Sequence, residues 1–172
     1  MLTRVKSVFF LWVDQREVLR LSLALIFSFA ASHAVLASGV DDGFDPNANG
    51  TINVVRIRPD NRIMIAGDFT SVGGATRTRV AALWNYGGID VDFADPNVNG
   101  NVVTMAIQAD NKIWIGGSFT QVGGVDHPNI ARLLPNGAVE GVFTTPNGSI
   151  TSMALQPDGK LIIGGNFTMI GS

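Results

Sequence analysis

Two short runs of oxygen-bearing side chains have a spacing that suits the binding of a metal ion. In each run Asp, Asn and Asn occupy every second position and a glycine follows. The two runs are Asp45, Asn47, Asn49 and Gly50, and Asp95, Asn97, Asn99 and Gly100. Alternating oxygen ligands with a glycine at the turn are typical of the start of a calcium-binding loop. The Asp and Asn residues of both runs are therefore calcium candidates.

The same residues also fit a purely structural role. Each run offers one carboxylate, and the twelfth loop position is Arg56 or Ala106 where a calcium loop has Glu. The third comparable stretch, Thr145-Pro146-Asn147-Gly148, has lost the aspartate. Asp and Asn also hydrogen-bond turn backbone and tolerate left-handed conformations. Turn formation is the alternative to calcium at these positions.

Catalytic chemistry has few candidates. His127 is the one histidine after residue 37, it lies in a loop, and the spacing nominates no nucleophile for it. We expect it to be a solvated loop residue. Asp60, Asp110 and Asp158 each mark the tip of a hairpin, which is a turn position and not an acid–base pair. We expect no catalytic residue, no cofactor site and no enzymatic activity of the chain's own.

Three aromatic side chains could stack on a sugar or a peptide. They are Trp84, Tyr86 and Trp114. Trp114 aligns with Met64 and Ile162 in the repeat described next, so packing between blades is the expected role for it.

These residues belong to an internal repeat. A shift of 50 residues aligns Asp60–Thr70 with Asp110–Thr120, and a further shift of 48 brings in Gln156–Thr168. Gly, Asp, Phe and Thr recur at fixed offsets, so shared composition does not explain the match. The sequence divides into 44–92, 93–142 and 143–172, and the last copy is incomplete.

Each copy has the pattern of short β-strands. Apolar residues alternate with a period of two over 52–58 and again from Ile63, with turn residues between them. A third strand is expected at 80–84 and 130–134, and a short fourth at 89–93 and 139–143. Glycines before Phe69, Phe119 and Phe167 predict a bulge or a close backbone approach.

Four short strands in about 50 residues are the size of a propeller blade. We therefore predict an all-β fold, a partial β-propeller of about 2.6 four-stranded repeats of 48–50 residues. Propellers have about four to eight blades. The chain is thus expected to be a fragment of a longer protein, and closure of a ring by several copies is the alternative. Uncovered blade edges would also allow self-association.

The repeat motifs resemble a known family. The unit runs Phe-x-Pro-Asn, Asn-Gly, Gln-Pro-Asp-Gly-Lys, Gly-Gly-x-Phe-Thr, Val-Gly-Gly and Ala-Arg-Leu, and its best match is Gln156–Lys160. This combination over residues 44–172 resembles the delta-60 repeat of bacterial exported proteins. The resemblance implies β-propeller blades in long surface or secreted chains and implies no chemistry. Arg58 and Ala109 depart from the pattern, where the third copy has Gln156 and Pro157.

The first 37 residues differ from the rest in composition. They contain no glycine or proline, although the whole chain has 20 Gly and 7 Pro. Basic residues and then the apolar run Leu21–Ala31 precede Val35-Leu36-Ala37, which fits an export cleavage site. We expect residues 1–37 to be an N-terminal hydrophobic helix that acts as a signal peptide, with an uncleaved membrane anchor as the alternative. Residues 38–172 form the repeat domain.

The charge and the cysteine content exclude several classes of binding partner and site. After residue 37 there are eight basic and twelve acidic residues, which argues against nucleic-acid binding. The absence of cysteine excludes disulfides, thiolate zinc sites and cysteine nucleophiles. We expect an exported scaffold or binding module whose loop faces meet a protein or glycan ligand, with the membrane contacted only through the N-terminal segment. The alternative is part of a secreted propeller-based hydrolase or lyase whose catalytic residues lie in other blades.

Overall fold

The fold is known from a computed structural model that describes residues 45–141 and 143–171. Units 1, 2 and 3 denote the repeat copies 44–92, 93–142 and 143–172. The prediction of an all-β chain is confirmed, because the described part contains strands, bridges and turns and no helix. The N-terminal helix expected in 1–37 lies outside the described residues. None of the described residues belongs to a helix long and apolar enough to cross a membrane.

Units 1 and 2 are built from the same elements, and unit 3 contains the first pair of them. The strands of unit 1 are β1 (Thr51–Ile57), β2 (Ile63–Asp68), β3 (Ser71–Val72), β4 (Ala75–Thr76) and β5 (Val80–Leu83). The strands of unit 2 are β6 (Asn101–Ile107), β7 (Ile113–Ser118), β8 (Gln121–Val122), β9 (Val125–Asp126) and β10 (Ile130–Leu133). Unit 3 has β11 (Ile150–Leu155) and β12 (Leu161–Gly165).

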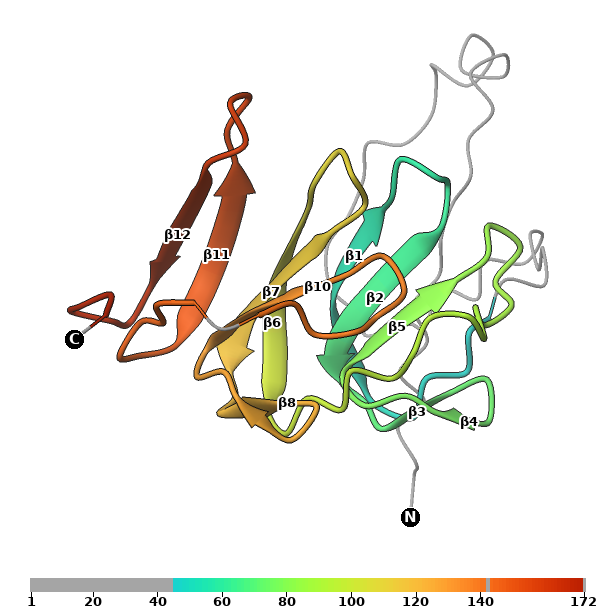
Figure 1. The fold of residues 1–172 in the computed structure, drawn as a ribbon. Helices are drawn as coiled ribbons and strands as arrows, with labels where there is room; N and C mark the ends of the chain where they lie inside the picture. Colours follow the sequence, from blue (N-terminus) through green and yellow to red (C-terminus); the bar gives the residue numbers. More distant parts are fainter. Residues whose placement is uncertain (1–44, 142, 172) are drawn as a thin grey trace, which may run out of the picture.

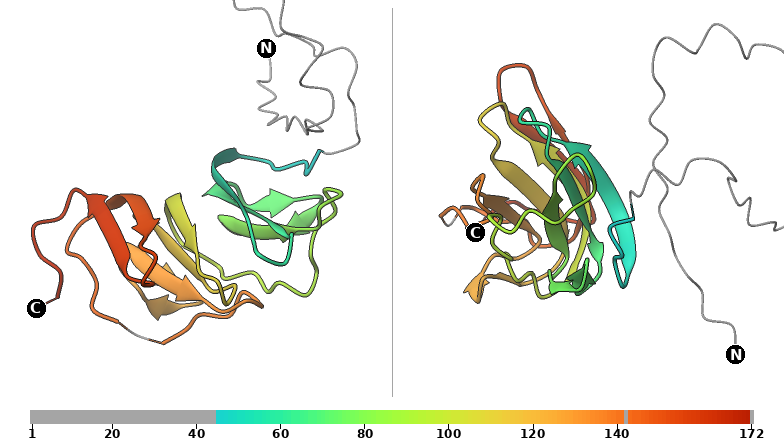
Figure 2. Two further views of the ribbon diagram at one scale, coloured as in Figure 1. Left: turned by 90° about the horizontal axis from the view of Figure 1, so that it is seen from above. Right: turned by 90° about the vertical axis from the view of Figure 1, so that its right-hand side faces the viewer.

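Each unit has one main antiparallel sheet, and units 1 and 2 add a two-stranded hairpin. The strand order is β1-β2-β5 in unit 1, β6-β7-β10 in unit 2 and β11-β12 in unit 3. Figures 1 and 2 show the three sheets standing side by side as successive blades, with β6 beside both β1 and β11. The small hairpins β3–β4 and β8–β9 were not predicted from the sequence.

The fourth strand is reduced to a single pair of residues. Leu83 bridges Ile89 in unit 1, and Leu133 bridges Val139 in unit 2. The extended strand expected over 89–93 is wrong because the chain turns at 91–92 and directs Phe93 into the core. Two consecutive β-turn residues end the pairing after one bridge.

The predicted bulge and close approach are both present. In β1 the register skips Asn53, because Ile52 pairs with Gly67 and Val54 pairs with Ala66. A side chain at Gly67 would overlap the carbonyl oxygen of Thr51. The same skip recurs in β6 and β11. Glycine at this point of the second strand lets the bulged first strand lie directly against it.

The two faces of the unit 1 sheet belong to different apolar clusters. Met64, Ala66 and Ala82 of unit 1 lie in one apolar cluster with residues of unit 2. The unit 2 members on its sheet include Met105, Ile113, Ile115, Ala131 and Leu133. Ile65 and Leu83, on the opposite face of unit 1, belong to a separate cluster. In unit 2 alternation gives the two faces different neighbours, because Ile115 packs with unit 1 while a side chain at Gly116 would meet Met153 and Ile150 of unit 3.

The blades present two ends. The hairpin end holds the turns 58–62, 108–112 and 156–160, at the top of Figure 1. The loop end holds β3–β4, β8–β9 and the segments 45–50, 95–100 and 145–149, at the bottom. Each unit passes to the next through the loop end, so residues there can fix one blade against another.

Candidate functional site

Two of the calcium-candidate asparagines, Asn49 and Asn99, hold the loop that follows the second strand of their unit by hydrogen bonds. The Asn49 Oδ1 accepts the backbone N–H groups of Thr70 and Ser71, at 2.8 and 2.9 Å, and its Nδ2 donates to the Thr70 hydroxyl at 2.8 Å. Asn99 makes the same three bonds to 120–121. Asn147, in the copy that lost the aspartate, makes them to 168–169. One amide thus closes the loop after the second strand in every unit.

The calcium-candidate aspartates hold turns. The Asp45 Oδ1 accepts the Asn47 N–H at 2.8 Å, and the Asp95 Oδ1 accepts the Asn97 N–H at 3.1 Å. Asn47 and Asn97 have φ of 46° and 48°, the left-handed conformation that asparagine tolerates. The structure therefore supports the turn-forming interpretation of these residues. Among residues 45–141 and 143–171, no three His, Cys, Asp or Glu side chains gather where they could hold a metal.

Asp95 also joins unit 2 to unit 1. Its carboxylate accepts the Thr78 backbone N–H at 2.9 Å and the Thr78 hydroxyl at 3.0 Å. At the next junction the corresponding residues are Pro128 and Thr145. Proline has neither an N–H nor a hydroxyl to donate, so a carboxylate opposite it would have no partner. The third copy therefore lacks both the aspartate and its donor.

The hairpin-tip aspartates have the turn role expected of them. The Oδ1 atoms of Asp60, Asp110 and Asp158 each accept the backbone N–H two residues later, at 3.1–3.2 Å. Each hairpin closes with a left-handed residue, Asn61, Asn111 or Gly159. This geometry is typical of a three-residue hairpin loop. Because the three tips belong to separate blades, they do not form acid–base pairs.

An ionic cluster at the hairpin end was missed by sequence reasoning. Asp60 binds Arg58 and Arg62, both at 2.9 Å, and Arg62 reaches the buried Asp90 at 2.6 Å. Arg58 is itself buried and donates to the carbonyl of Pro135 in unit 2 at 2.9 Å. Burial lowers the pKa of the Arg58 guanidinium, and the Asp60 charge opposes that effect. The cluster locks one hairpin tip to the outer turn of the next blade.

The sequence contained a signal for this cluster. Arg58 replaces the glutamine found at the same position in units 2 and 3, and Asp90 aligns with Glu140. In unit 2, Glu140 binds Lys112 at 2.9 Å and Arg132 at 2.7 Å. These bonds lower the pKa of the Glu140 carboxyl, with the hydrogen bond from Lys112 as the main cause. A carboxylate seven residues after the third strand therefore pairs with the basic residue of the hairpin tip.

His127 is buried, so the expectation of a solvated loop histidine is wrong. It is 1% exposed, and its ring centroid lies 5.9 Å from that of Phe143. Its Nδ1 has no hydrogen-bond partner among the described atoms. Burial lowers the pKa of the imidazole, and the neighbouring Asp126 charge opposes this. The His127 side chain is therefore packed inside the protein against the Phe143 ring.

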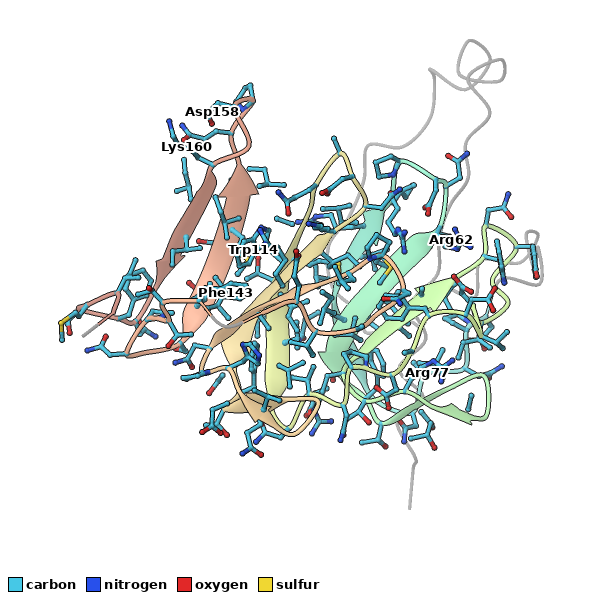
Figure 3. All side chains as sticks on the ribbon, in the orientation of Figure 1. Arg62, Arg77, Trp114, Phe143, Asp158 and Lys160 are labelled. Atoms are coloured by element: carbon cyan, nitrogen blue, oxygen red, sulfur yellow. The ribbon has the colours of Figure 1, made fainter. Side chains whose placement is uncertain are left out.

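Arginine covers aromatic rings at two places. Trp84 lies 4.4 Å below the Arg62 guanidinium and stacks parallel to the exposed Tyr86 at 6.5 Å. Trp114 contacts Phe143 at 5.1 Å, with Arg132 over both rings (Figure 3). Trp114 therefore packs where unit 2 meets unit 3, as the sequence predicted. Tyr86 exposes an aromatic surface.

The sheets and their repeated junctions define this protein as a β-propeller repeat chain. The sequence matches the family described as "Domain of unknown function (DUF5122) beta-propeller" over residues 58–93, 108–140 and 156–172. These matches cover half of the chain, and the chain belongs to this family. No curated protein and no solved structure matches it.

Proposed function

We propose that this chain is an exported, non-enzymatic repeat module that binds a protein or glycan ligand through its loop end. It would work as part of a longer surface or secreted bacterial protein, and its blades would be of the delta-60 repeat type. Propeller architecture alone does not fix a function, so the proposal depends on what the side chains do.

The observation that carries the proposal is that the same asparagine hydrogen bonds hold small hairpins whose exposed side chains differ between units. Asn49 and Asn99 make the same bonds, but the short strands after the Gly-Gly turns differ, with Ala75–Thr76 in β4 and Val125–Asp126 in β9. Thr76 and both unit 2 residues are exposed. A shared frame that carries variable exposed side chains is typical of binding surfaces.

Ligand binding is tested on glycan and peptide arrays with the full chain. We expect Val125→Ser with Asp126→Ser to remove at least nine-tenths of the signal for any ligand found, while the melting temperature stays within about 1 °C. Lys160→Ser is the matched control, because Lys160 is also exposed but lies at the hairpin end. Equal loss in both variants, or in neither, contradicts binding at the loop end.

Export is tested separately with residues 1–45 fused to a reporter enzyme that is active only outside the cytoplasm. We expect activity, with the mature chain beginning at Ser38 by mass spectrometry. Ile26→Arg, which interrupts the apolar run, should abolish it. A reporter that stays inactive with the unchanged leader contradicts export and leaves the binding test standing.

A further inference from the structure

A hollow of about 310 Å³ lies at the hairpin end where units 1 and 2 meet. It is bounded by the hairpin turns 58–62 and 108–112 and by the outer turn of unit 2 at 135–136. The lining residues all lie within 58–136, in the two units that have three-stranded sheets. Its volume is at the lower end of the range for small-molecule sites, about 300–1,000 Å³.

Arg58 carries an unpaired donor at this hollow. The residue is 4% exposed, its Nη1 donates to the Pro135 carbonyl at 2.9 Å, and its Nη2 binds the Asp60 carboxylate at 2.9 Å. Its Nε has no hydrogen-bond partner among the described atoms. In a planar guanidinium the Nε–H and one Nη2–H lie along the same edge. The free N–H therefore points to the side of Asp60, which lines the hollow, where an added oxygen atom would satisfy it.

Acceptor groups stand beside this donor. The Asn111 Oδ1, on the opposite hairpin tip, is buried and has no partner among the described atoms. The exposed Asp92 carboxylate also lines the hollow. The exposed Asn136 amide lies on the same lining and adds an N–H donor. Donors and acceptors that a ligand could use therefore lie together.

The charges of the lining select among ligands. Two arginines and three aspartates line the hollow, namely Arg58, Arg62, Asp60, Asp90 and Asp92. The carboxylates repel an anion, and the guanidinium groups repel a metal ion or an organic cation. A hydroxyl group carries no charge and both donates and accepts, so hydroxyls can pair with the free donor and the free acceptors.

We propose that this hollow binds one sugar unit of a glycan. One hydroxyl of the sugar accepts the Arg58 Nε–H, and another donates to the Asn111 Oδ1. The exposed Pro135 ring gives an apolar surface for the C–H groups of the sugar. The hollow lies at the opposite end of the blades from the loop end, so this site does not rest on ligand binding there (Figure 1).

The repeat itself supplies substitutions that suit the local backbone. Gln108 and Gln156 stand where unit 1 has Arg58. Gly159 stands where unit 2 has Asn111, and both residues have positive φ, 84° and 66°. Arg58→Gln therefore removes the free donor, and Asn111→Gly removes the free acceptor, with residues that other units place at the same positions.

The chain also offers a matched control. Asn61 occupies in unit 1 the tip position that Asn111 occupies in unit 2, with φ of 64°. It is exposed and is not among the residues that line the hollow. Asn61→Gly makes the same chemical change at the same backbone conformation and should leave sugar binding unchanged.

The test is an NMR titration of the full chain with the methyl glycosides of glucose, galactose, mannose and N-acetylglucosamine. We expect at least one glycoside to shift the Arg58 Nε–H signal and the amides of 58–62 and 135–136, with saturation in the millimolar range. Arg58→Gln and Asn111→Gly should each weaken this binding at least fivefold. If Arg58→Gln does not fold, Asn111→Gly decides the outcome.

Three results would overturn the proposal. The first is no saturable shift with any of the four glycosides. The second is unchanged affinity in Asn111→Gly, or an equal loss in Asn61→Gly. The third is a shift that disappears in the loop-end variant Val125→Ser with Asp126→Ser, which would assign the sugar to the loop end.

Discussion

The junction between units 1 and 2 and the junction between units 2 and 3 use the same repeat motif but reach different degrees of closure. At the first, Phe93 is fully covered and Asp95 is bound to Thr78. At the second, Phe143 is half-buried, and Thr145 stands opposite Pro128 where the first has Asp95 and Thr78. Units 1 and 2 meet mainly through β6 against β1 and β2, and units 2 and 3 meet through β11 against β6 and β7, so the two junctions share one arrangement of strands and differ in their side chains.

The largest expected difference is between the two phenylalanines. Phe93→Ala should lower the free energy of unfolding by about 3–5 kcal/mol, because it removes a buried ring and leaves a cavity. Phe143→Ala should lower it by about 1–2 kcal/mol, because water already reaches part of the ring. Urea unfolding of the full chain measures both, and Phe93→Leu is a milder variant if Phe93→Ala does not fold. Equal losses would mean that the two junctions are closed alike.

The ionic clusters give the next contrast. Asp90→Ala should destabilise the chain by about 2–3 kcal/mol, because it leaves the Arg62 guanidinium without its buried partner. Glu140→Ala should have a smaller effect, because Lys112 and Arg132 keep access to water. The loss for Glu140→Ala should also shrink in 1 M salt more than that for Asp90→Ala. Identical salt dependence would contradict the difference in burial.

Substitutions can remove the Asp95–Thr78 hydrogen bonds from the first junction and introduce equivalent bonds at the second. Asp95→Ala should cost about 1–2 kcal/mol of unfolding free energy by removing the bonds to Thr78. Thr145→Asp alone should not stabilise the chain, because Pro128 has no N–H. Thr145→Asp combined with Pro128→Thr should stabilise it by about 1 kcal/mol. The thermal midpoints of the three variants test this pairing, and a gain from Thr145→Asp alone would contradict it.

The smallest expected effect is the pH response of His127. Its pKa is lowered in the folded chain by burial, so the unfolded chain binds the proton more readily. Stability should therefore fall as the pH drops below about 6.5, the ordinary histidine value. The difference in melting temperature between pH 7.0 and 5.5 should shrink in His127→Gln. An unchanged difference in that variant would assign the pH response to other groups.

Local patterns in the sequence were sufficient to predict the longer strands and the hairpin turns, but not the hairpins β3–β4 and β8–β9. Period-two alternation located β1, β2, β6 and β7, and Asp-Asn or Asp-Gly marked the hairpin tips. Gly67 predicted the close approach because no other residue fits beside the bulged strand. These features depend on neighbours along the chain or on one adjacent strand, so spacing alone reveals them.

The environment of individual side chains was harder to predict. His127 looks like a solvated loop residue until Phe143, sixteen positions later, is folded against it. Arg58 looks exposed until the outer turn of unit 2 covers it and accepts its hydrogen bond. Both depend on contacts between blades, which no local pattern encodes.

The sequence by itself determined the repeat, the all-β fold and the positions of the turns, because these follow from alternation and from the backbone preferences of Gly, Asn, Asp and Pro. Only the tertiary structure decided which face of each blade meets which neighbour and whether Asp95 has a donor. Burial and hydrogen-bond partnership arise from segments about 50 residues apart that pack together, and one copy of the motif does not specify what its neighbour supplies.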